Sequence, residues 1–403
     1  MEKDRPVVPA VGNTPSAAVR RWTVVSISTA LMLAATGCGT TPVAKGIPPR
    51  PTTAEAHTPV AVGTIRRIAF ANSSNGWMAF TPPGAPTTVE IAYTGDGGAV
   101  WAQTKRLQVG RPGGWTWAPL GRHTLLVVVS SPSNTGSLNS VLTTTDSGQT
   151  WRATQFHSAV GPGYLVTAKT GSRAACALVA SEPSLGGVAA TLYCGPVDGR
   201  WHQVATRFGS GPAGFLPGLF PNGLTMAGGA AWITGQNVSS GPDLLYASHA
   251  SGRSFQPLSV PVPAATNADT WPVVVTPGAA PALPVILYGS TGATFLVYHQ
   301  TAHGAWQAAT PLTTQANPGP PGALLYSAVS TQVMFVRGRH TLYATANRGT
   351  TWTAVNHVPN AWSLMQFATA NQGWAVAAPA TLLHTADGGR TWTTERYRVY
   401  RPH

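Results

Sequence analysis

The sequence predicts an all-β protein that folds as a single seven-bladed β-propeller of four-stranded blades. Two observations predict this fold. A short turn motif recurs through most of the chain at intervals of 40 to 54 residues, and short runs of alternating or branched apolar residues flank each copy. Short strands separated by turn signals at a steady period are typical of propeller blades. Helical periodicity is absent beyond the N-terminal segment, which excludes a mixed α/β architecture.

The N-terminal segment has the features of an export signal. Arg20 and Arg21 precede an apolar stretch, residues 22–35, that is short for a transmembrane helix. The stretch leads into AATGC, and small residues before a cysteine resemble a bacterial lipobox. The resemblance implies that residues 1–37 are a lipoprotein signal peptide and that Cys38 is lipidated after cleavage. An uncleaved anchor helix is the alternative. Both interpretations place the rest of the chain outside the cytoplasmic membrane, anchored to its outer face.

Two further segments complete the predicted organisation. Residues 38–58 are rich in Pro and Thr and predict an extended tether. Residues 59–403 are predicted to form the propeller, with blade 7 completed either by its own chain or by a strand near residues 59–65. Cys176 and Cys194 lie in one predicted hairpin, and in an exported protein we expect them to form a disulfide.

The repeated turn motif reads T-x-D-x-G-x-x-W in its clearest form. The Asp carboxylate can accept hydrogen bonds from the N–H groups of its own turn, and Gly supplies a positive φ. The Trp opens the next strand and packs across the hairpin. We therefore interpret the motif as a structural staple of a β-hairpin rather than as a set of catalytic acids. The residues to which we assign this role are Asp96, Gly98, Trp101, Asp146, Gly148, Trp151, Gly349, Trp352, Asp387, Gly389 and Trp392.

Some copies depart from the motif. Ala250 and Asn347 replace the Asp in two copies, which leaves the carboxylate staple in question for those hairpins. Weaker copies occupy residues 195–202 and 300–307. With these included, the chain carries seven units, one for each predicted blade.

The motif resembles the BNR or Asp-box repeat. In addition, NGWM (75–78) and QGWA (372–375) ahead of a motif copy resemble the photosystem II stability/assembly factor family of seven-bladed propellers, over about residues 60–403. The resemblance implies a binding or assembly protein rather than an enzyme. Phosphate-loop, zinc-protease and calcium-loop motifs are absent from the sequence, so we expect no cofactor and no metal.

The charge of the chain is strongly basic, with 25 Lys and Arg against 12 Asp and Glu. The sequence lacks a basic helix and an aromatic RNA-binding motif, which argues against nucleic acid as a partner. A basic surface is suited to an anionic membrane. Arg66, Arg67, Arg337 and Arg339 are candidates for a binding surface.

We expect a monomeric scaffold that binds an envelope protein. Two alternatives stay open. A module that binds cell-wall glycan would use exposed Trp such as Trp115 or Trp117. A sialidase-like glycoside hydrolase would need paired carboxyl groups in a cleft, for which Glu182 and Asp269 are the candidates outside the motif.

Overall fold

The computed structural model confirms the predicted all-β fold, and it contains no helix among the residues that it describes. A membrane-spanning helix is accordingly not found in that part of the chain. The predicted signal peptide, Cys38 and the tether up to residue 57 lie outside it. The description covers residues 58–402 except 110–113, 162–163, 170–172, 183–186, 206–207, 209–214, 218, 238–244, 250–251, 263–266, 277–278, 289–291, 316–323, 359–361 and 378.

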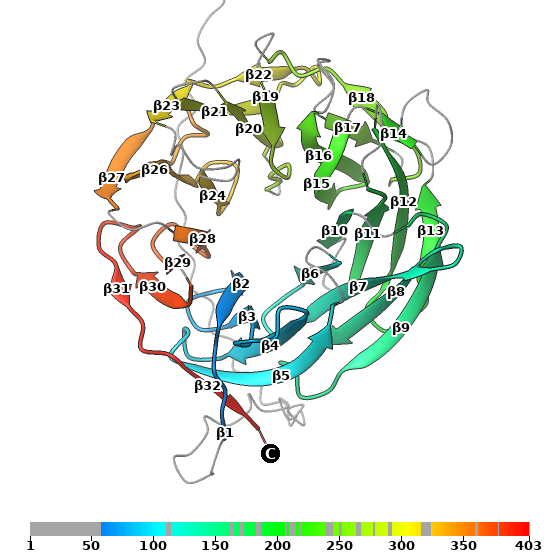
Figure 1. Ribbon diagram of the computed structural model, residues 1–403. Helices are drawn as coiled ribbons and strands as arrows, with labels where there is room; N and C mark the ends of the chain where they lie inside the picture. The colour runs from blue at the N-terminus through cyan, green and yellow to red at the C-terminus, as the bar shows by residue number, and fades with distance from the viewer. Residues whose placement is uncertain are drawn as a thin grey trace, which may run out of the picture. The chain divides into compact units, whose positions relative to one another are not determined.

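Seven blades are arranged in a ring (Figure 1), and the strands within each blade pair antiparallel. One backbone pairing, Gln236 with Asp269, joins two neighbouring blades into a continuous sheet. Blade 1 consists of β2 (Thr64–Phe70), β3 (Gly76–Thr81), β4 (Thr88–Thr94) and β5 (Val100–Gln108). Blade 2 consists of β6 (Trp115–Pro119), β7 (Leu125–Ser133), β8 (Gly136–Thr144) and β9 (Arg152–Ser158). Blade 3 consists of β10 (Tyr164–Lys169), β11 (Ala174–Ala180), β12 (Gly187–Pro196), β13 (His202–Ala205) and β14 (Phe215–Pro217).

The remaining blades repeat this order. Blade 4 consists of β15 (Leu219–Ala227), β16 (Ala230–Asn237), β17 (Leu245–Ser248) and β18 (Gln256–Leu258). Blade 5 consists of β19 (Asn267–Thr270), β20 (Ala282–Tyr288), β21 (Gly292–Gln300), β22 (Trp306–Ala308) and β23 (Leu312–Gln315). Blade 6 consists of β24 (Leu325–Ala328), β25 (Met334–Arg337), β26 (Thr341–Thr345) and β27 (Thr353–His357). Blade 7 consists of β28 (Trp362–Phe367), β29 (Gly373–Ala377), β30 (Thr381–Thr385) and β31 (Thr393–Thr394).

The outer strand is divided in two of the blades. In blade 3, β12 pairs first with β14 and then, further along, with β13. In blade 5, β21 pairs in the same way with β23 and β22. These are blades in which the turn motif is weakest, so the loss of the motif accompanies an irregular outer strand.

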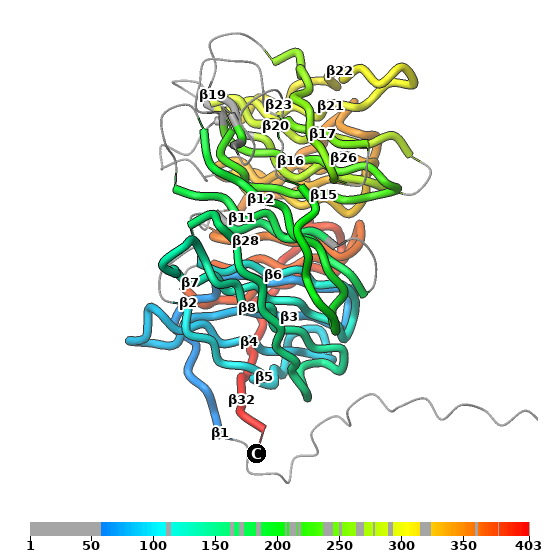
Figure 2. The backbone as a smooth tube through the Cα atoms, turned by 90° about the vertical axis from the view of Figure 1, so that its right-hand side faces the viewer, coloured from blue at the N-terminus to red at the C-terminus, as the bar shows by residue number. Residues whose placement is uncertain are grey.

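The C-terminal strand closes the ring. Blade 7 is completed by its own chain, and β32 (Arg398–Arg401) adds to the outside of blade 1, parallel to β5. The short strand β1 (Thr58–Pro59) then pairs with β32. Both ends of the described chain therefore meet at one edge of blade 1 (Figures 1 and 2). Of the two alternatives for blade 7, the first is thus observed, and residues 59–65 contribute instead to β1 and to the start of β2.

Aromatic stacking joins blade 7 to blade 1. The ring of Phe70, at the end of β2, stacks on Trp374 of β29 with a centroid distance of 3.5 Å and an interplanar angle of 2°. The amide of Gln366 bridges the same two blades, because Oε1 accepts from the Phe70 N–H at 2.6 Å and Nε2 donates to the Phe70 carbonyl at 3.0 Å. A Cβ on Gly76 would lie 2.6 Å from the Phe70 ring. The glycine of the NGW sequence therefore leaves room for the aromatic stack at the seam between the blades.

The same arrangement recurs between blades 6 and 7. Phe367 stacks on Phe335 at 3.6 Å and 5°, and a Cβ on Gly373 would lie 2.6 Å from the Phe367 ring. The two sequence stretches that resemble the assembly-factor family thus make equivalent contacts between successive blades.

Candidate functional site

The clearest copies of the turn motif form the hairpin staple that the sequence indicates. In the last copy, Asp387 accepts hydrogen bonds from the Thr391 N–H at 2.9 Å, from the Thr391 hydroxyl at 2.6 Å and from the Thr385 hydroxyl at 2.8 Å. Hydrogen bonds from Thr391 lower the pKa of Asp387 to about 2. The Trp392 indole N–H donates to the Gly389 carbonyl at 3.0 Å and holds the returning strand. The acid of this copy is therefore engaged within its own turn.

The first two copies have the same arrangement. The Thr94 hydroxyl and the Val100 N–H donate to Asp96 at 2.8 and 3.1 Å. Asp146 accepts from the Thr150 N–H at 2.9 Å and from its hydroxyl. Burial raises the pKa of Asp146, but the hydrogen bonds from Thr150 and its neighbours outweigh that effect and the net pKa is lowered.

Asparagine substitutes for aspartate in the blade 6 copy. The Asn347 side-chain oxygen accepts from the Thr351 N–H and from the Thr345 hydroxyl, both at 2.9 Å. Its amide also donates to the Thr351 hydroxyl at 2.8 Å. The staple therefore needs the acceptor oxygen and not the negative charge, which answers the question that the sequence left open for this hairpin.

The motif glycines have a second role that sequence reasoning missed. Each has a positive φ, and each packs against the preceding blade. A Cβ on Gly389 would lie 2.4 Å from Leu342 of blade 6, and a Cβ on Gly148 would lie 2.4 Å from Thr104 of blade 1. The turns that contain Gly98, Gly148, Gly252, Gly349 and Gly389 are thus also contacts between blades, which no pattern within a single repeat indicates.

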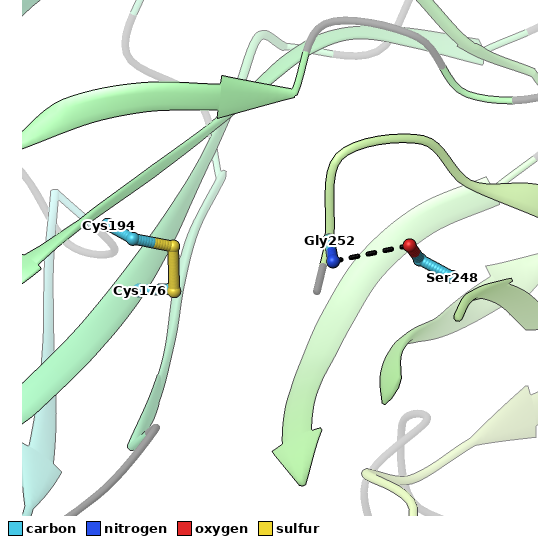
Figure 3. The surroundings of a disulfide bond; sticks show 4 residues. All are labelled: Cys176, Cys194, Ser248 and Gly252. Carbon is cyan, nitrogen blue, oxygen red and sulfur yellow. Dashed lines mark hydrogen bonds between the residues drawn. A yellow bond between two sulfur atoms is a disulfide. The ribbon is translucent and has the colours of Figure 1, made fainter. Parts of the chain in front are cut away.

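The weaker blade 4 copy keeps part of the staple. The Gly252 N–H donates to the Ser248 hydroxyl at 3.2 Å (Figure 3). Ala250 lies outside the described residues. Phe255, at the position of the motif Trp, is fully buried, and its ring stacks on that of Phe208 with a centroid distance of 5.5 Å.

The two predicted cysteines are joined in a disulfide. Cys176 of β11 and Cys194 of β12 are direct cross-strand partners with a Cα–Cα distance of 4.0 Å (Figure 3). The bond lies within blade 3, which has only a degenerate turn motif.

The strand register defines two ends of the ring. The motif turns gather at one end, which we call the motif face. At the opposite end, Thr64 pairs with Thr81 in blade 1, and Leu325 pairs with Arg337 in blade 6. All four candidate arginines lie toward this second end, so we call it the arginine face. The topology therefore places at the same end of the ring residues that are separated by about 270 positions in the chain.

A β-bulge presents the first arginine pair. The register of β2 and β3 shifts at Arg66, so Arg66 and Arg67 are both exposed although they are adjacent in a strand. Arg66 Nε donates to the Thr81 hydroxyl at 2.9 Å. The Arg67 guanidinium carbon lies 5.1 Å from the centroid of the Trp115 ring, and the surrounding protein lowers the pKa of Arg67 by desolvation.

The second arginine pair differs from the expectation of an exposed group. Arg337 has only 2% of its surface exposed, and its guanidinium carbon lies 5.4 Å from the centroid of the Trp362 ring. Desolvation lowers its pKa. Its Nη2 donates to the Arg339 carbonyl at 3.1 Å, whereas Arg339 itself is exposed. Trp362 of the next blade therefore covers the Arg337 side chain. Through its hydrogen bond to the Arg339 carbonyl, Arg337 supports the loop that presents Arg339.

An apolar groove runs along β24, and one of its lining residues, Leu325, lies toward the end of the arginine face. Its volume is about 480 Å³, and its walls come from blades 5, 6 and 7, including Trp271, Tyr326, Leu364 and Met365. Trp271 stacks on Tyr326 at 4.8 Å and 12°. Leu325, which also lines the groove, is the strand partner of Arg337.

The tryptophans proposed for glycan stacking are not freely exposed. Trp115 retains 7% of its surface and Trp117 is half-buried, and the two rings pack edge to face at 6.3 Å. Trp115 was expected to be exposed, and this expectation is wrong, because the ring packs in the contact between blades 1 and 2.

The described acids outside the motif are mostly engaged in ion pairs. Glu90 is 2% exposed and lies 3.7 Å from Arg106. Arg173 Nη2 lies 2.8 Å from Asp198, and His384 lies 3.3 Å from Glu395. Glu182 is exposed at the end of β11, and the side chain of Asp269 lies outside the described part. A group of three or more metal-binding side chains is not found among the described residues.

Comparisons with known proteins identify the fold. Neither a protein-family model nor a curated protein matches this sequence. The chain is similar to the structure described as YCF48 bound to D1 peptide, with a TM-score of 0.53 and 16% identity, over 82% of this chain and 93% of that chain. It is also similar to the GH74 xyloglucanase from Xanthomonas campestris, with a TM-score of 0.53 and 13% identity, over 85% of this chain and 55% of that chain. An ancestral GH74 enzyme has a TM-score of 0.51 and 12% identity, over 85% of this chain and 47% of that chain. These similarities confirm the propeller, and the enzymes are about twice as long as the region shared with them.

Proposed function

We propose that this protein is an exported, lipid-anchored and monomeric scaffold without catalytic activity, which binds an envelope protein at the arginine face. The observation that carries the proposal is that the exposed arginines Arg66, Arg67 and Arg339 lie toward the same end of the ring as Leu325, which lines an apolar groove. Arg and Trp are enriched among the residues that dominate protein–protein binding, and an apolar pocket rimmed by polar groups is typical of such sites. Arg66, Arg67 and Arg339 supply positive charge at this end of the ring, and the Trp271–Tyr326 pair supplies an apolar wall of the groove.

Most of the described carboxylates already have hydrogen-bond or ion-pair partners, which supports a scaffold rather than a hydrolase. Glycosidases need two carboxyl groups that face a substrate across a cleft. In the described part of the chain, the motif acids accept hydrogen bonds within their turns, and Glu90, Asp198 and Glu395 pair with cations. The YCF48 structure of similar fold holds a peptide, which is a precedent for peptide binding by this architecture.

A pull-down from the native cell envelope tests the proposal. The full chain is compared with Arg66→Gln/Arg67→Gln/Arg339→Gln, and the matched control is Arg152→Gln/Arg200→Gln/Arg253→Gln, which removes the same charge from the motif face. We expect one stoichiometric envelope protein, lost in the first variant and retained in the control. Capture of saccharide on a glycan array without a protein partner would contradict the scaffold, as would turnover of a glycan by the purified chain.

A further inference from the structure

A second basic surface lies at the outer edge of blade 1. It is formed where the C-terminal strand β32 runs beside β5, and we call it the basic edge. Its cations are Lys105, Arg106, Arg396, Arg398 and Arg401. The four arginines are exposed and Lys105 is half-buried. None of these residues is one of the four candidate arginines. Lys105 and Arg106 lie toward the same end of the ring as Arg66, but on the outer strand β5 rather than on β2.

The parallel pairing of β32 and β5 sets Arg398, Arg401, Lys105 and Arg106 in a row along one sheet edge, with adjacent side chains on opposite faces of the sheet, and Arg396 precedes β32. Arg398 lies opposite Val100 in the register, and Arg401 Nε donates to the Gln103 side chain at 2.8 Å. Beyond the end of β32, Lys105 and Arg106 continue along β5 in the same direction. At the usual rise of a β-strand, the row from Arg398 to Arg106 extends over about 20 Å.

The acids near the basic edge do not cancel its charge at the surface. Glu90 lies 3.7 Å from Arg106 but is buried, so its carboxylate is not presented to a partner. Glu395 lies 3.3 Å from His384. Asp96, which is exposed in the turn before β5, accepts from the Thr94 hydroxyl and the Val100 N–H. Five cations therefore outnumber these three acids, and the net charge at this edge is positive.

The position of the basic edge in the chain indicates its partner. Strand β1, where the described chain begins, pairs with β32. The residues before Thr58 lead back over about 20 positions to Cys38. The row of cations is thus the part of the propeller that is joined most directly to the segment that we propose to be anchored. Clusters of Lys and Arg close to a membrane attachment are attracted to anionic lipid headgroups.

We propose that the basic edge binds an anionic phospholipid surface and so orients the propeller relative to the membrane. This inference goes beyond the scaffold function, because it concerns the lipid and not the protein partner. It leaves Arg66 and Arg67 available to that partner, because they lie on β2, at the opposite edge of the blade 1 sheet from β5 and β32.

Vesicle binding tests this inference. The chain from residue 38 onward, carrying Cys38→Ser so that it lacks both the acylation site and the apolar segment 22–35, is mixed with phosphatidylcholine vesicles with and without phosphatidylglycerol. The variant Lys105→Gln/Arg396→Gln/Arg398→Gln is compared with the motif-face control Arg152→Gln/Arg200→Gln/Arg253→Gln, which has the same net charge. These substitutions leave the Arg401–Gln103 and Arg106–Glu90 contacts intact, and thermal unfolding checks that each variant is folded.

We expect the edge variant to bind phosphatidylglycerol vesicles about 100-fold more weakly than the parent, since each basic residue near the surface contributes about fivefold. The control should bind like the parent, and raised salt should abolish the difference because it screens exposed charges. Equal losses in both variants, or no preference of the parent for phosphatidylglycerol, would overturn the inference. Partner capture by the edge variant is measured in parallel, so that failure of the lipid surface and failure of the scaffold are told apart.

Discussion

The double role of the motif glycines is tested by Gly389→Ala. Gly389 has φ +90°, a conformation that costs a residue with a Cβ about 1–2 kcal/mol. The new methyl group would also lie 2.4 Å from Leu342 Cδ2. Leu342 is fully buried, so its side chain has no free space into which to turn, and overpacking of this kind adds about 1–3 kcal/mol. The expected loss of unfolding free energy is therefore about 2–5 kcal/mol.

Gly84→Ala is the matched control. Gly84 has φ +72°, but no heavy atom lies within 4 Å of a Cβ placed there. Only the backbone cost of about 1–2 kcal/mol is expected. Equilibrium unfolding in urea measures both variants, and an unchanged m-value shows that midpoints are comparable. Equal destabilisation of the two variants would refute the claim that the motif turn is a blade contact.

A double-mutant cycle makes the test sharper. Leu342→Ala opens space opposite Gly389 and is destabilising by itself, as are other large-to-small core changes. Combined with Gly389→Ala, it should relieve part of the clash, so the double variant should be more stable than the sum of the single effects predicts. Additive effects would show that the two residues do not oppose each other.

Three further predictions concern the staple, the disulfide and the ring closure. Asp387→Ala should lose about 1 kcal/mol of stability, as for loss of a helix cap, whereas Asp387→Asn should retain most of it because Asn347 forms the same contacts. The folded-state pKa of Asp387, about 2, lies below the unfolded value of about 3.9. The charged carboxylate should therefore contribute its full stability above pH 4, and this contribution should be lost as the pH falls toward 2. Unfolding measured as a function of pH should show this loss in the parent and not in Asp387→Asn. Replacing Cys176 and Cys194 by Ser should cost about 3 kcal/mol in urea unfolding, and a reductant should then have no further effect. Deleting residues 396–403 should accelerate amide hydrogen exchange in β5 but not in β9 of blade 2, and unchanged exchange in β5 would contradict closure by β32.

The repeated motif was sufficient to predict the fold because each copy marks the same hairpin in each blade. Asp146 and Trp151 are close in sequence, so their relation is visible in one repeat. Contacts between repeats were not predictable in this way. The packing of Gly148 on Thr104 and the covering of Arg337 by Trp362 depend on the neighbouring blade, which no local pattern describes.

The candidate site shows the same division. The arginines were candidates from the sequence alone, but only the ring topology places them at one end. The bulge at Arg66 is the reason that Arg66 and Arg67 are both exposed, although they are adjacent in a strand. The closing strand β32 was not predicted, because its four residues carry no strand alternation strong enough to indicate a partner. Its parallel pairing with β5 depends on the geometry of the closed ring.

The short strand β1 has a mechanical consequence. It is a two-residue strand, and in the described sheet its partner is β32 rather than a strand of blade 1 itself. A pulling force applied to the residues before Thr58 would therefore load the β1–β32 pair before it reached the hydrogen bonds of β2 to β5. The contacts between β1 and β32 would break first, which would lengthen the tether, and the seven blades would remain folded.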